Sequence, residues 1–308
     1  MNAEHFVELE LINEAVREDP IGFIQRCDQA YTDRVEKAAD TVISRLHLSR
    51  IILLAGPSAS GKTTTASRVR RALEQRGIYC HMVSLDDYYR MKTDDGFPRT
   101  PNGELDLEAP EALRIDLLNE HLGALDRGEE ILVPHYDFQR QCISEEGTPL
   151  QLHENEAVIF EGIHGLNPMF TDRHPEATRL FVSPATYVFH QDEEVFDRVW
   201  LRVIRRTVRD YYFRCASAAD TLGMWANVRR GEKRYITPYK KTAHYHIDSA
   251  HNYEIPALRP IVEKLLTNVE NNPQELLTEE ILHGLMQFEP LDINLLPPTC
   301  LLKEEFLP

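Results

Sequence analysis

The side chains best suited to chemistry belong to a glycine-rich loop that follows a short apolar segment. Residues 56–63 match G-x-x-x-x-G-K-[ST] at every fixed position and directly follow the apolar residues 51–55. When a buried strand enters such a loop and a helix leaves it, loop N–H groups point inward and the helix N-terminus adds positive potential. The pattern predicts a nucleoside triphosphate site, with Lys62 at the β- and γ-phosphates and the Thr63 hydroxyl at Mg²⁺. The residues expected to bind the nucleotide are Gly56, Ser58, Ala59, Ser60, Gly61, Lys62, Thr63 and Thr64.

Acidic residues that follow two further apolar segments could act beside this loop. Asp86 and Asp87 follow the first of them, where a carboxylate can accept the proton of a hydroxyl that attacks the γ-phosphate, or help to hold Mg²⁺. We favour this role for Asp86, whereas Asp87 is equally suited to capping the next turn. Glu161 ends the other segment, the usual place for a second carboxylate on the Mg²⁺ side. His164 is as compatible with a structural role as with a substrate contact.

A basic segment is the third chemical feature. Between Arg198 and Lys241 stand twelve basic and three acidic residues, a net charge of +9 in a chain whose net charge is −16. In a helix expected over residues 193–212, four arginines share one face, and because like charges repel, an anion would neutralise them. Alternatively, these arginines are exposed to solvent and bind no anion. Arginines here could stabilise charge on a transferring phosphoryl group, and spacing does not choose among the candidates Arg205, Arg206, Arg209 and Arg214. The opposite face should enter the core through Phe196, Val199, Trp200, Val203, Ile204, Val208 and Tyr211.

Composition limits the class of protein. With 308 residues, 42% of them hydrophobic, the chain can bury a full core as one large or two small domains. No apolar stretch approaches the roughly 20 residues that span a bilayer, the first residues lack the basic flank of a signal peptide, and the five cysteines stand far apart. We therefore expect a cytoplasmic protein with free thiols. Its acidic surface argues against nucleic acid or an anionic membrane as a partner.

The order of sequence patterns predicts an α/β fold. Residues 1–48 are expected to form an N-terminal extension of two helices divided near Pro20. In residues 49–308, strands alternate with helices, as in a P-loop NTPase-type, mostly parallel sheet flanked by helices, with ligands at the carboxyl ends of the strands. Strands are expected at 51–55, 78–84, 157–160 and 180–183, and helices at 63–76, 110–127, 193–212, 258–269 and 273–288. Residues 91–108 are expected to form a functional loop, 198–241 an arginine-bearing lid, and 254–308 a tail packed on the domain.

Several separate motifs, in a fixed order, resemble the uridine kinase/phosphoribulokinase family. They are residues 56–64, 84–90, 133–138, 160–163 and, most specifically, 201–214 with its continuation to Glu232. The resemblance covers about residues 45–300. It is closest to the kinase domain of bacterial uridine-kinase-like proteins that carry a threonyl-tRNA-synthetase-like N-terminal domain, for which the first 48 residues are too few.

The resemblance implies phosphorylation of a sugar hydroxyl by ATP or GTP, typically the 5′-hydroxyl of a pyrimidine nucleoside. By this likeness Asp86 is the catalytic base, and Thr63 and Glu161 lie on the Mg²⁺ side. Tyr89 and Tyr136 line the nucleoside, and Glu108 binds the ribose hydroxyls, with Asp106 as the alternative. Arg205 and Arg209 match arginines that contact phosphate, and relatives suggest a homo-oligomer.

The sequence departs from the family where the base is recognised. Gln141 and Ile143 occupy positions that carry a histidine and an arginine in uridine–cytidine kinases, so a charge-assisted hydrogen bond is lost. Three functions therefore stay open: a nucleoside kinase, a kinase of another sugar-like or cofactor-like hydroxyl, and a non-catalytic, nucleotide-gated interaction protein. A proton acceptor such as Asp86 counts against the third, because a pure switch does not need one.

Overall fold

A parallel five-stranded sheet forms the centre of the molecule. The computed structural model describes residues 5–137, 140–144, 146–267 and 269–308. The strand order is β12-β9-β2-β8-β3, and every pair is parallel. In that order the strands are Tyr245–Asp248, Thr178–Ser183, Ile51–Ala55, Glu156–Glu161 and Tyr79–Ser84. The predicted α/β class with a mostly parallel sheet is thereby confirmed.

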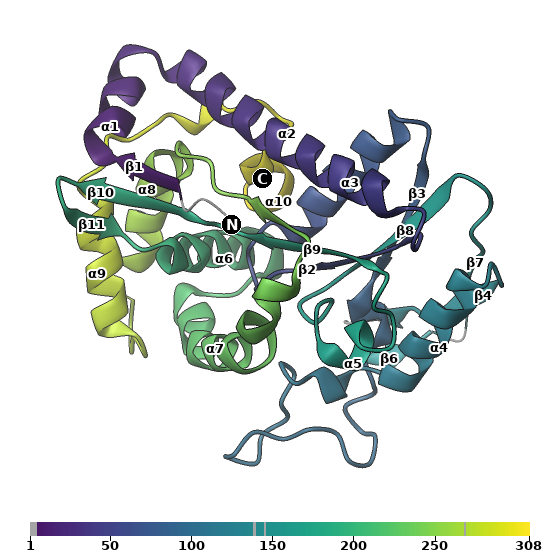
Figure 1. Cartoon of the computed structure of the whole chain (residues 1–308). Coiled ribbons are helices and arrows are strands. Elements are labelled where there is room, and N and C mark those ends of the chain that lie inside the picture. The colour runs from purple at the N-terminus through teal and green to yellow at the C-terminus, as the bar shows by residue number, and fades with distance from the viewer. Residues whose placement is uncertain (1–4, 138–139, 145, 268) are drawn as a thin grey trace.

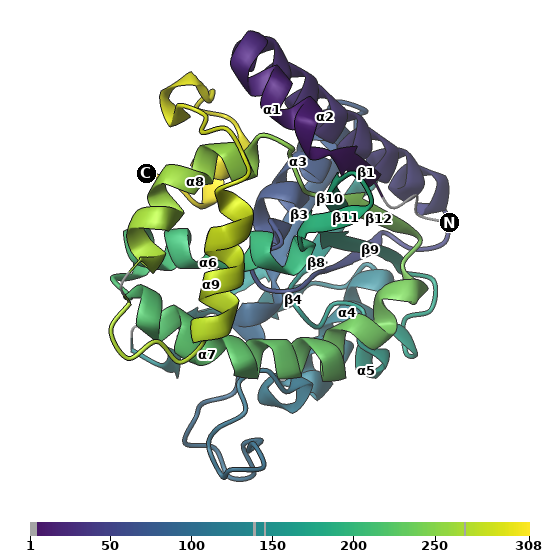
Figure 2. The same ribbon diagram turned by 90° about the vertical axis from the view of Figure 1, so that its left-hand side faces the viewer.

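Helices cover both faces of this sheet, which explains why its strands are continuously apolar (Figures 1 and 2). All five residues of β2 are at most 1% exposed. Ile52 and Leu54 face a core shared with α2 (Pro20–Arg45) and α3 (Lys62–Glu74). Ile51 and Leu53 face a second core that contains residues of α4 (Ile115–Asp126) and α5 (Pro168–Thr171). Strands buried on both faces are typical of parallel sheets.

The N-terminal extension belongs to the first core. Helix α1 (Leu9–Glu18) and α2 meet at Pro20 as predicted, and the Asp19 carboxylate caps α2 by accepting from the N–H of Gly22. The sequence did not indicate β1 (His5–Glu8), which pairs in parallel with β10 (Thr186–His190). β10 in turn pairs with β11 (Glu193–Phe196), so these three strands form a separate small sheet.

The basic helix differs from its prediction at both ends. Residues 193–196 are strand β11, and α6 (Arg198–Arg214) starts after Asp197, whose carboxylate accepts from the N–H of Val199. Val203, Ile204 and Val208 are buried as expected. Tyr211 was expected in the core but is 47% exposed, because the last turn of α6 extends beyond the packed region.

Helices also form the region after α6. These are α7 (Ala218–Gly231), a π-helix (Glu232–Ile236), a 3-10 helix (Thr237–Thr242), α8 (Glu254–Leu266), α9 (Glu275–Leu285), a 3-10 turn (Ile293–Leu295) and α10 (Leu301–Glu305). Leu301, Leu302 and Phe306, near the end of the chain, are fully buried. Within the described ranges, no helix is long and apolar enough to cross a membrane.

The chain that follows β3 is irregular. Strand β3 leads into a 3-10 helix (Leu85–Tyr88), and residues 91–108 form a loop that projects from the body (Figure 1). The helix expected over 110–127 begins as a 3-10 turn (Pro110–Ala112) before α4. Two short hairpins follow: β4 (Ile131–Val133) with β7 (Thr148–Leu150), and β5 (Tyr136–Asp137) with β6 (Cys142–Ile143).

Candidate active site

The phosphate loop joins β2 to α3 and requires both of its glycines. A Cβ at Gly56 would overlap the carbonyl oxygen of Val182, so only glycine fits there. Gly61 has φ 81° and caps α3, a left-handed conformation that glycine adopts without strain. Helix α3 starts at Lys62, where the sequence pattern places it. Loop and helix therefore have the arrangement that a phosphate site needs.

Lys62, Thr63 and Glu161 meet where β2 and β8 end. Thr63 Oγ1 donates to Glu161 Oε1 at 3.0 Å, and Lys62 Nζ donates to the carbonyl oxygen of Pro57 at 3.2 Å. Burial lowers the pKa of Lys62, which Glu161 partly offsets. Burial likewise raises the pKa of Glu161, against the effect of Lys62. The neighbouring opposite charges of Lys62 and Glu161 thus partly compensate each other.

Thr63 and Glu161 suit Mg²⁺ by their chemistry. Mg²⁺ prefers oxygen ligands and is usually held by one or two carboxylates, phosphate oxygens and water. No group of three or more His, Cys, Asp or Glu side chains placed to hold a metal occurs among the described residues. In such sites the protein provides only one or two of the Mg²⁺ ligands. The hydroxyl of Thr63 and the carboxylate of Glu161, side by side next to the phosphate loop, fit this requirement.

Asp86 lies in a cavity of about 570 Å³ beside this loop. It follows the edge strand β3, and its N–H donates to Ser84 Oγ at 3.2 Å. The side chain is open to water through the cavity, yet protein surrounds it on most sides, and this desolvation raises its pKa. Lys62 acts in the opposite direction. Asp86 therefore lies between Lys62 of the phosphate loop and this cavity.

Aromatic side chains form a wall of the same cavity. The rings of Tyr89 and Tyr136 lie 6.1 Å apart between centroids at a tilt of 55°. Tyr89 OH donates to the carbonyl oxygen of Leu107 at 3.0 Å. Asp87 Oδ1 accepts from the N–H of Tyr136 at 3.2 Å and lies 3.0 Å from His135 Nδ1. Asp87 thus connects the aromatic wall of the cavity to the 3-10 helix that carries Asp86.

Glu108 does not line the cavity, but it lies close enough to Arg206, Lys62 and Asp86 for their charges to affect its pKa, whereas Asp106 is held by other contacts. Burial raises the pKa of Glu108 to about 7, with Arg206 lowering it and Asp106 raising it. Asp106 Oδ1 accepts from the N–H of Glu108 at 3.2 Å and from Arg230 at 3.4 Å. Gly231 of α7 packs directly on Glu108, because a Cβ there would overlap that of Glu108. Of the two acids left open by the sequence, the geometry favours Glu108.

The expectation that Arg205 is a lid arginine is contradicted by the structure. Arg205 is fully buried, and its guanidinium donates to both carboxylate oxygens of Glu254, at 2.7 and 2.6 Å. Arg202 is 4% exposed and pairs with Glu232 at 2.9 Å. Both acids come from other elements, so the helix sequence alone did not reveal them.

The other three candidate arginines converge near the site. Arg206, Arg209 and Arg214 all contact the buried carboxylate of Asp210, at 3.3, 3.0 and 3.4 Å. Arg214 also lines the cavity, and Arg209 is close enough to lower the pKa of Lys62. One carboxylate contacts three guanidinium groups, so the cluster keeps a net positive charge that can attract an anion. Sequence reasoning missed Asp210, although its spacing of four residues from Arg206 and Arg214 is the signal for such contacts.

Two further candidates occupy different surroundings. Gln141 lines the cavity, with φ 54°, while Ile143 pairs with Tyr136 in the β5–β6 hairpin and is not part of the cavity lining. His164 is buried outside that lining, its ring edge-on to Tyr235, and burial lowers its pKa to about 3. Neither ring nitrogen of His164 has a hydrogen-bond partner among the described residues, so the structural role and the substrate contact both stay open. Phe138, part of one family motif, lies outside the described residues.

Comparison with known proteins gives a consistent result. The family model described as "Phosphoribulokinase / Uridine kinase family" matches residues 51–256. The chain is 29% identical over 194 residues to a uridine kinase of Staphylococcus haemolyticus, covering 63% of this chain and 84% of that protein. It is 29% identical over 224 residues to a uridine kinase of Anoxybacillus flavithermus, covering 72% and 96%.

Among solved structures, a D-glycerate 3-kinase of Cryptococcus neoformans is similar with a TM-score of 0.44 and 16% identity, covering 67% of this chain and 89% of that one. So low a score does not identify an acceptor. The family model, by contrast, covers more than half of the chain and includes the phosphate loop, Asp86, Glu161 and the arginines of α6. This chain is a kinase of the phosphoribulokinase/uridine kinase family.

Proposed function

We propose that this chain transfers the γ-phosphate of ATP, or of GTP, to a hydroxyl of a nucleoside-like acceptor. The observation that carries the proposal is the position of Asp86, in a cavity of about 570 Å³ whose wall includes Tyr89 and Tyr136. Aromatic rings can stack on a base, and a carboxylate can accept a hydroxyl proton. The relatives named uridine kinases support the same acceptor class.

In this proposal, the chain supplies positioning and charge. The loop N–H groups and Lys62 bind the β- and γ-phosphates, and Asp86 takes the proton from the attacking hydroxyl. Mg²⁺, when bound, would neutralise phosphate charge, with Thr63 and Glu161 as its protein ligands. Arg206, Arg209 and Arg214 offset the charge on the transferred group. The carboxylate of Glu108 accepts hydrogen bonds from the ribose hydroxyls.

A second acceptor class has specific support in the cavity. Lys92, Arg214 and Gln141 also line it, and the two cations would accommodate an acceptor that carries negative charge. We therefore keep a kinase of another sugar-like or cofactor-like hydroxyl as the second candidate.

A panel of acceptors distinguishes the two candidates. The purified chain is incubated with ATP and Mg²⁺ and with uridine, cytidine, purine nucleosides, or acidic sugar derivatives, and acceptor-dependent ADP formation is measured. Saturation by uridine or cytidine below about 1 mM, the usual KM range, supports the nucleoside proposal. Turnover with acidic acceptors alone contradicts it and supports the second candidate.

A further inference from the structure

Three arginines of α6 contact the phosphate loop. Arg202 Nε donates to the carbonyl oxygen of Ser58 at 2.9 Å, and Arg205 Nη1 donates to that of Ala59 at 3.3 Å. Arg206 Nη1 donates to Ser58 Oγ at 2.7 Å. We propose that Arg202 and Arg205 are positioning residues that hold the loop in its phosphate-binding conformation. This inference rests on the nucleotide half of the proposed function and is independent of the acceptor.

Peptide geometry explains how a contact at a carbonyl oxygen can orient the next N–H of the loop. In a planar trans peptide, the carbonyl oxygen and the next N–H point in opposite directions, and the described chain has no cis peptides. The bond from Arg202 to the oxygen of Ser58 therefore turns the N–H of Ala59 away from α6, toward the phosphate side. A loop free to rotate this peptide would lose a donor to the phosphates.

The backbone of Ala59 needs such support. Its φ is 57°, a left-handed conformation that is unfavourable for a residue with a side chain. Conformations of this kind persist where surrounding contacts enforce them. The hydrogen bond from Arg205 to the oxygen of Ala59 is one such contact, made by a side chain with no exposed surface.

The two arginines use the forked shape of the guanidinium group. Arg202 binds Glu232 through Nη1 while its Nε donates to the loop. Arg205 binds Glu254 through Nε and Nη2 while its Nη1 donates to the loop. A lysine has one compact ammonium group at a different reach and cannot reproduce both contacts in this geometry. Buried ion pairs contribute little net stability after desolvation, which points to orientation as their role.

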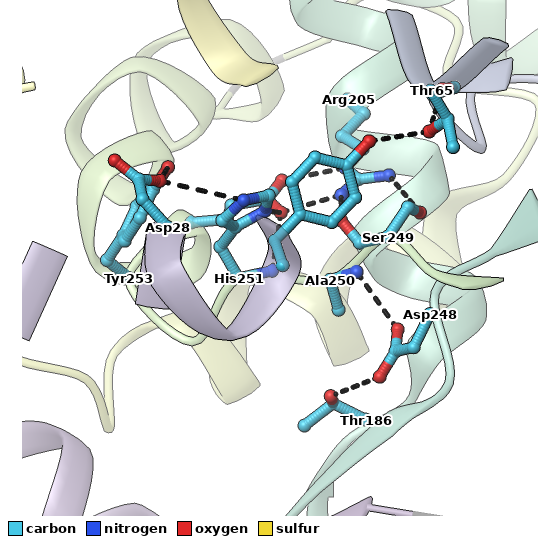
Figure 3. Close-up of polar contacts among 12 residues, drawn as sticks. Asp28, Thr65, Thr186, Arg205, Asp248, Ser249, Ala250, His251 and Tyr253 are labelled. Atoms are coloured by element: carbon cyan, nitrogen blue, oxygen red, sulfur yellow. Dashed lines mark hydrogen bonds and ion pairs between the residues drawn. The ribbon is translucent and has the colours of Figure 1, made fainter. Parts of the chain in front are cut away.

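Glu254, the acid that binds Arg205, is itself fixed by a buried polar network. Figure 3 shows Arg205, His251 and Asp28 of this network. Glu254 Oε1 accepts from the N–H of His251 at 2.8 Å, and His251 Nε2 lies 3.6 Å from Asp28 Oδ1. Burial raises the pKa of Glu254, but the charge of Arg205 and the side-chain hydrogen bond with His251 Nδ1, at 3.2 Å, outweigh this and bring it to about 2. Tyr253 OH donates to the same Asp28 oxygen at 2.7 Å. Because Asp28 belongs to α2, the network connects Arg205, and with it the phosphate loop, to α2.

Helix α2 also reaches the other end of the loop. Tyr31 OH lies 2.7 Å from Thr65 Oγ1, which donates to the carbonyl oxygen of Gly61 at 2.6 Å. The family model begins at residue 51, so α2 lies outside the region that it matches. The N-terminal extension therefore takes part in supporting the loop.

The test measures nucleotide affinity separately from folding. Arg202→Lys and Arg205→Lys are compared with Arg259→Lys, because Arg259 also joins an acid, Glu263, to a backbone oxygen, that of Phe288, but lies on α8 without a loop contact. Binding of ADP and of AMP is measured by calorimetry on the full chain, together with the thermal unfolding temperature. We expect Arg202→Lys and Arg205→Lys to weaken ADP binding by about tenfold or more, as for loss of a charged hydrogen bond.

The expected pattern is specific for phosphate. The loop N–H groups bind the β-phosphate, which AMP lacks, so the loss should be larger for ADP than for AMP, while Arg259→Lys keeps ADP affinity within about twofold. ADP affinity that is unchanged in Arg202→Lys, or reduced equally for ADP and AMP, would overturn the proposal. If Arg205→Lys does not fold, Arg202→Lys decides alone, because Arg202 pairs with Glu232 and not with Glu254. Neither outcome depends on which acceptor is used.

Discussion

At the scale of single residues, the main feature of the site is that its charged side chains are partly desolvated. Burial raises the pKa of Asp86 and of Glu161 and lowers that of Lys62, and each group limits the shift of its neighbours. A base with a raised pKa is a stronger proton acceptor, and the nearby ammonium keeps it ionised. The arrangement matches the needs of proton removal from an acceptor hydroxyl.

Glu108 should make acceptor binding depend on pH. Burial raises its pKa to about 7, so the carboxylate that would accept hydrogen bonds from ribose hydroxyls is present above that pH and lost below it. We expect the KM for the acceptor to rise as the pH falls from about 8 to about 6, while the KM for ATP changes less. Steady-state kinetics over this range measure the effect. Glu108→Gln should have a high acceptor KM at every pH, and a pH profile equal to that of the unchanged chain would exclude Glu108 from this role.

At the scale of elements, the close approach of α7 to Glu108 can be tested with a pair of glycines in the same helix. Gly231 lies directly on Glu108, whereas a Cβ at Gly223 would meet only Pro273, at 3.9 Å. Alanine favours a helix at both positions by about 1 kcal/mol. We expect Gly231→Ala to raise the acceptor KM by about tenfold through displacement of Glu108, and Gly223→Ala to leave it unchanged.

Equal kinetics of Gly231→Ala and Gly223→Ala would show that Glu108 is free to move or does not bind the acceptor. Thermal unfolding of both variants serves as the control for folding: alanine should stabilise the helix at Gly223, whereas at Gly231 the overlap with Glu108 acts against that gain.

The helix α6 shows how an element can be recognised while its function is misjudged. Its amphipathic pattern predicted a helix, and the arginines on one face suggested a solvated or phosphate-facing surface. The acids that pair with Arg202 and Arg205, Glu232 and Glu254, lie 30 and 49 residues further along the chain. No local sequence pattern predicts partners that are so far away in the chain. The contacts of Asp210 within the same helix were predictable from spacing alone.

At the scale of the whole molecule, terminal segments complete one core. The phosphate loop and the strand-end carboxylates could be predicted because the parallel sheet brings neighbouring strand ends together. Strand β1 could not, because its four residues pair with β10 about 180 positions away. Partners so distant leave no local signal in either segment.

The packing of the C-terminal tail yields a stability prediction with a matched control. Leu302 is fully buried, whereas Leu276 is 77% exposed. Leu302→Ala removes buried methyl groups and leaves a cavity, so it should lower the free energy of unfolding by about 2–5 kcal/mol. Leu276→Ala should change it by less than about 0.5 kcal/mol. Denaturant unfolding measures both, and equal stabilities would contradict the burial of the tail.

The most direct test of the central claim is acceptor phosphorylation by Asp86→Asn. The amide keeps the size of the side chain but cannot take up the hydroxyl proton, so we expect turnover to fall by 10² to 10⁴. ATP affinity should stay within about threefold of the unchanged chain, because the base acts on the acceptor and not on the nucleotide. The measurement combines acceptor-dependent ADP formation with nucleotide binding on the same preparation. Unchanged turnover in Asp86→Asn would contradict the assignment of Asp86 as the base.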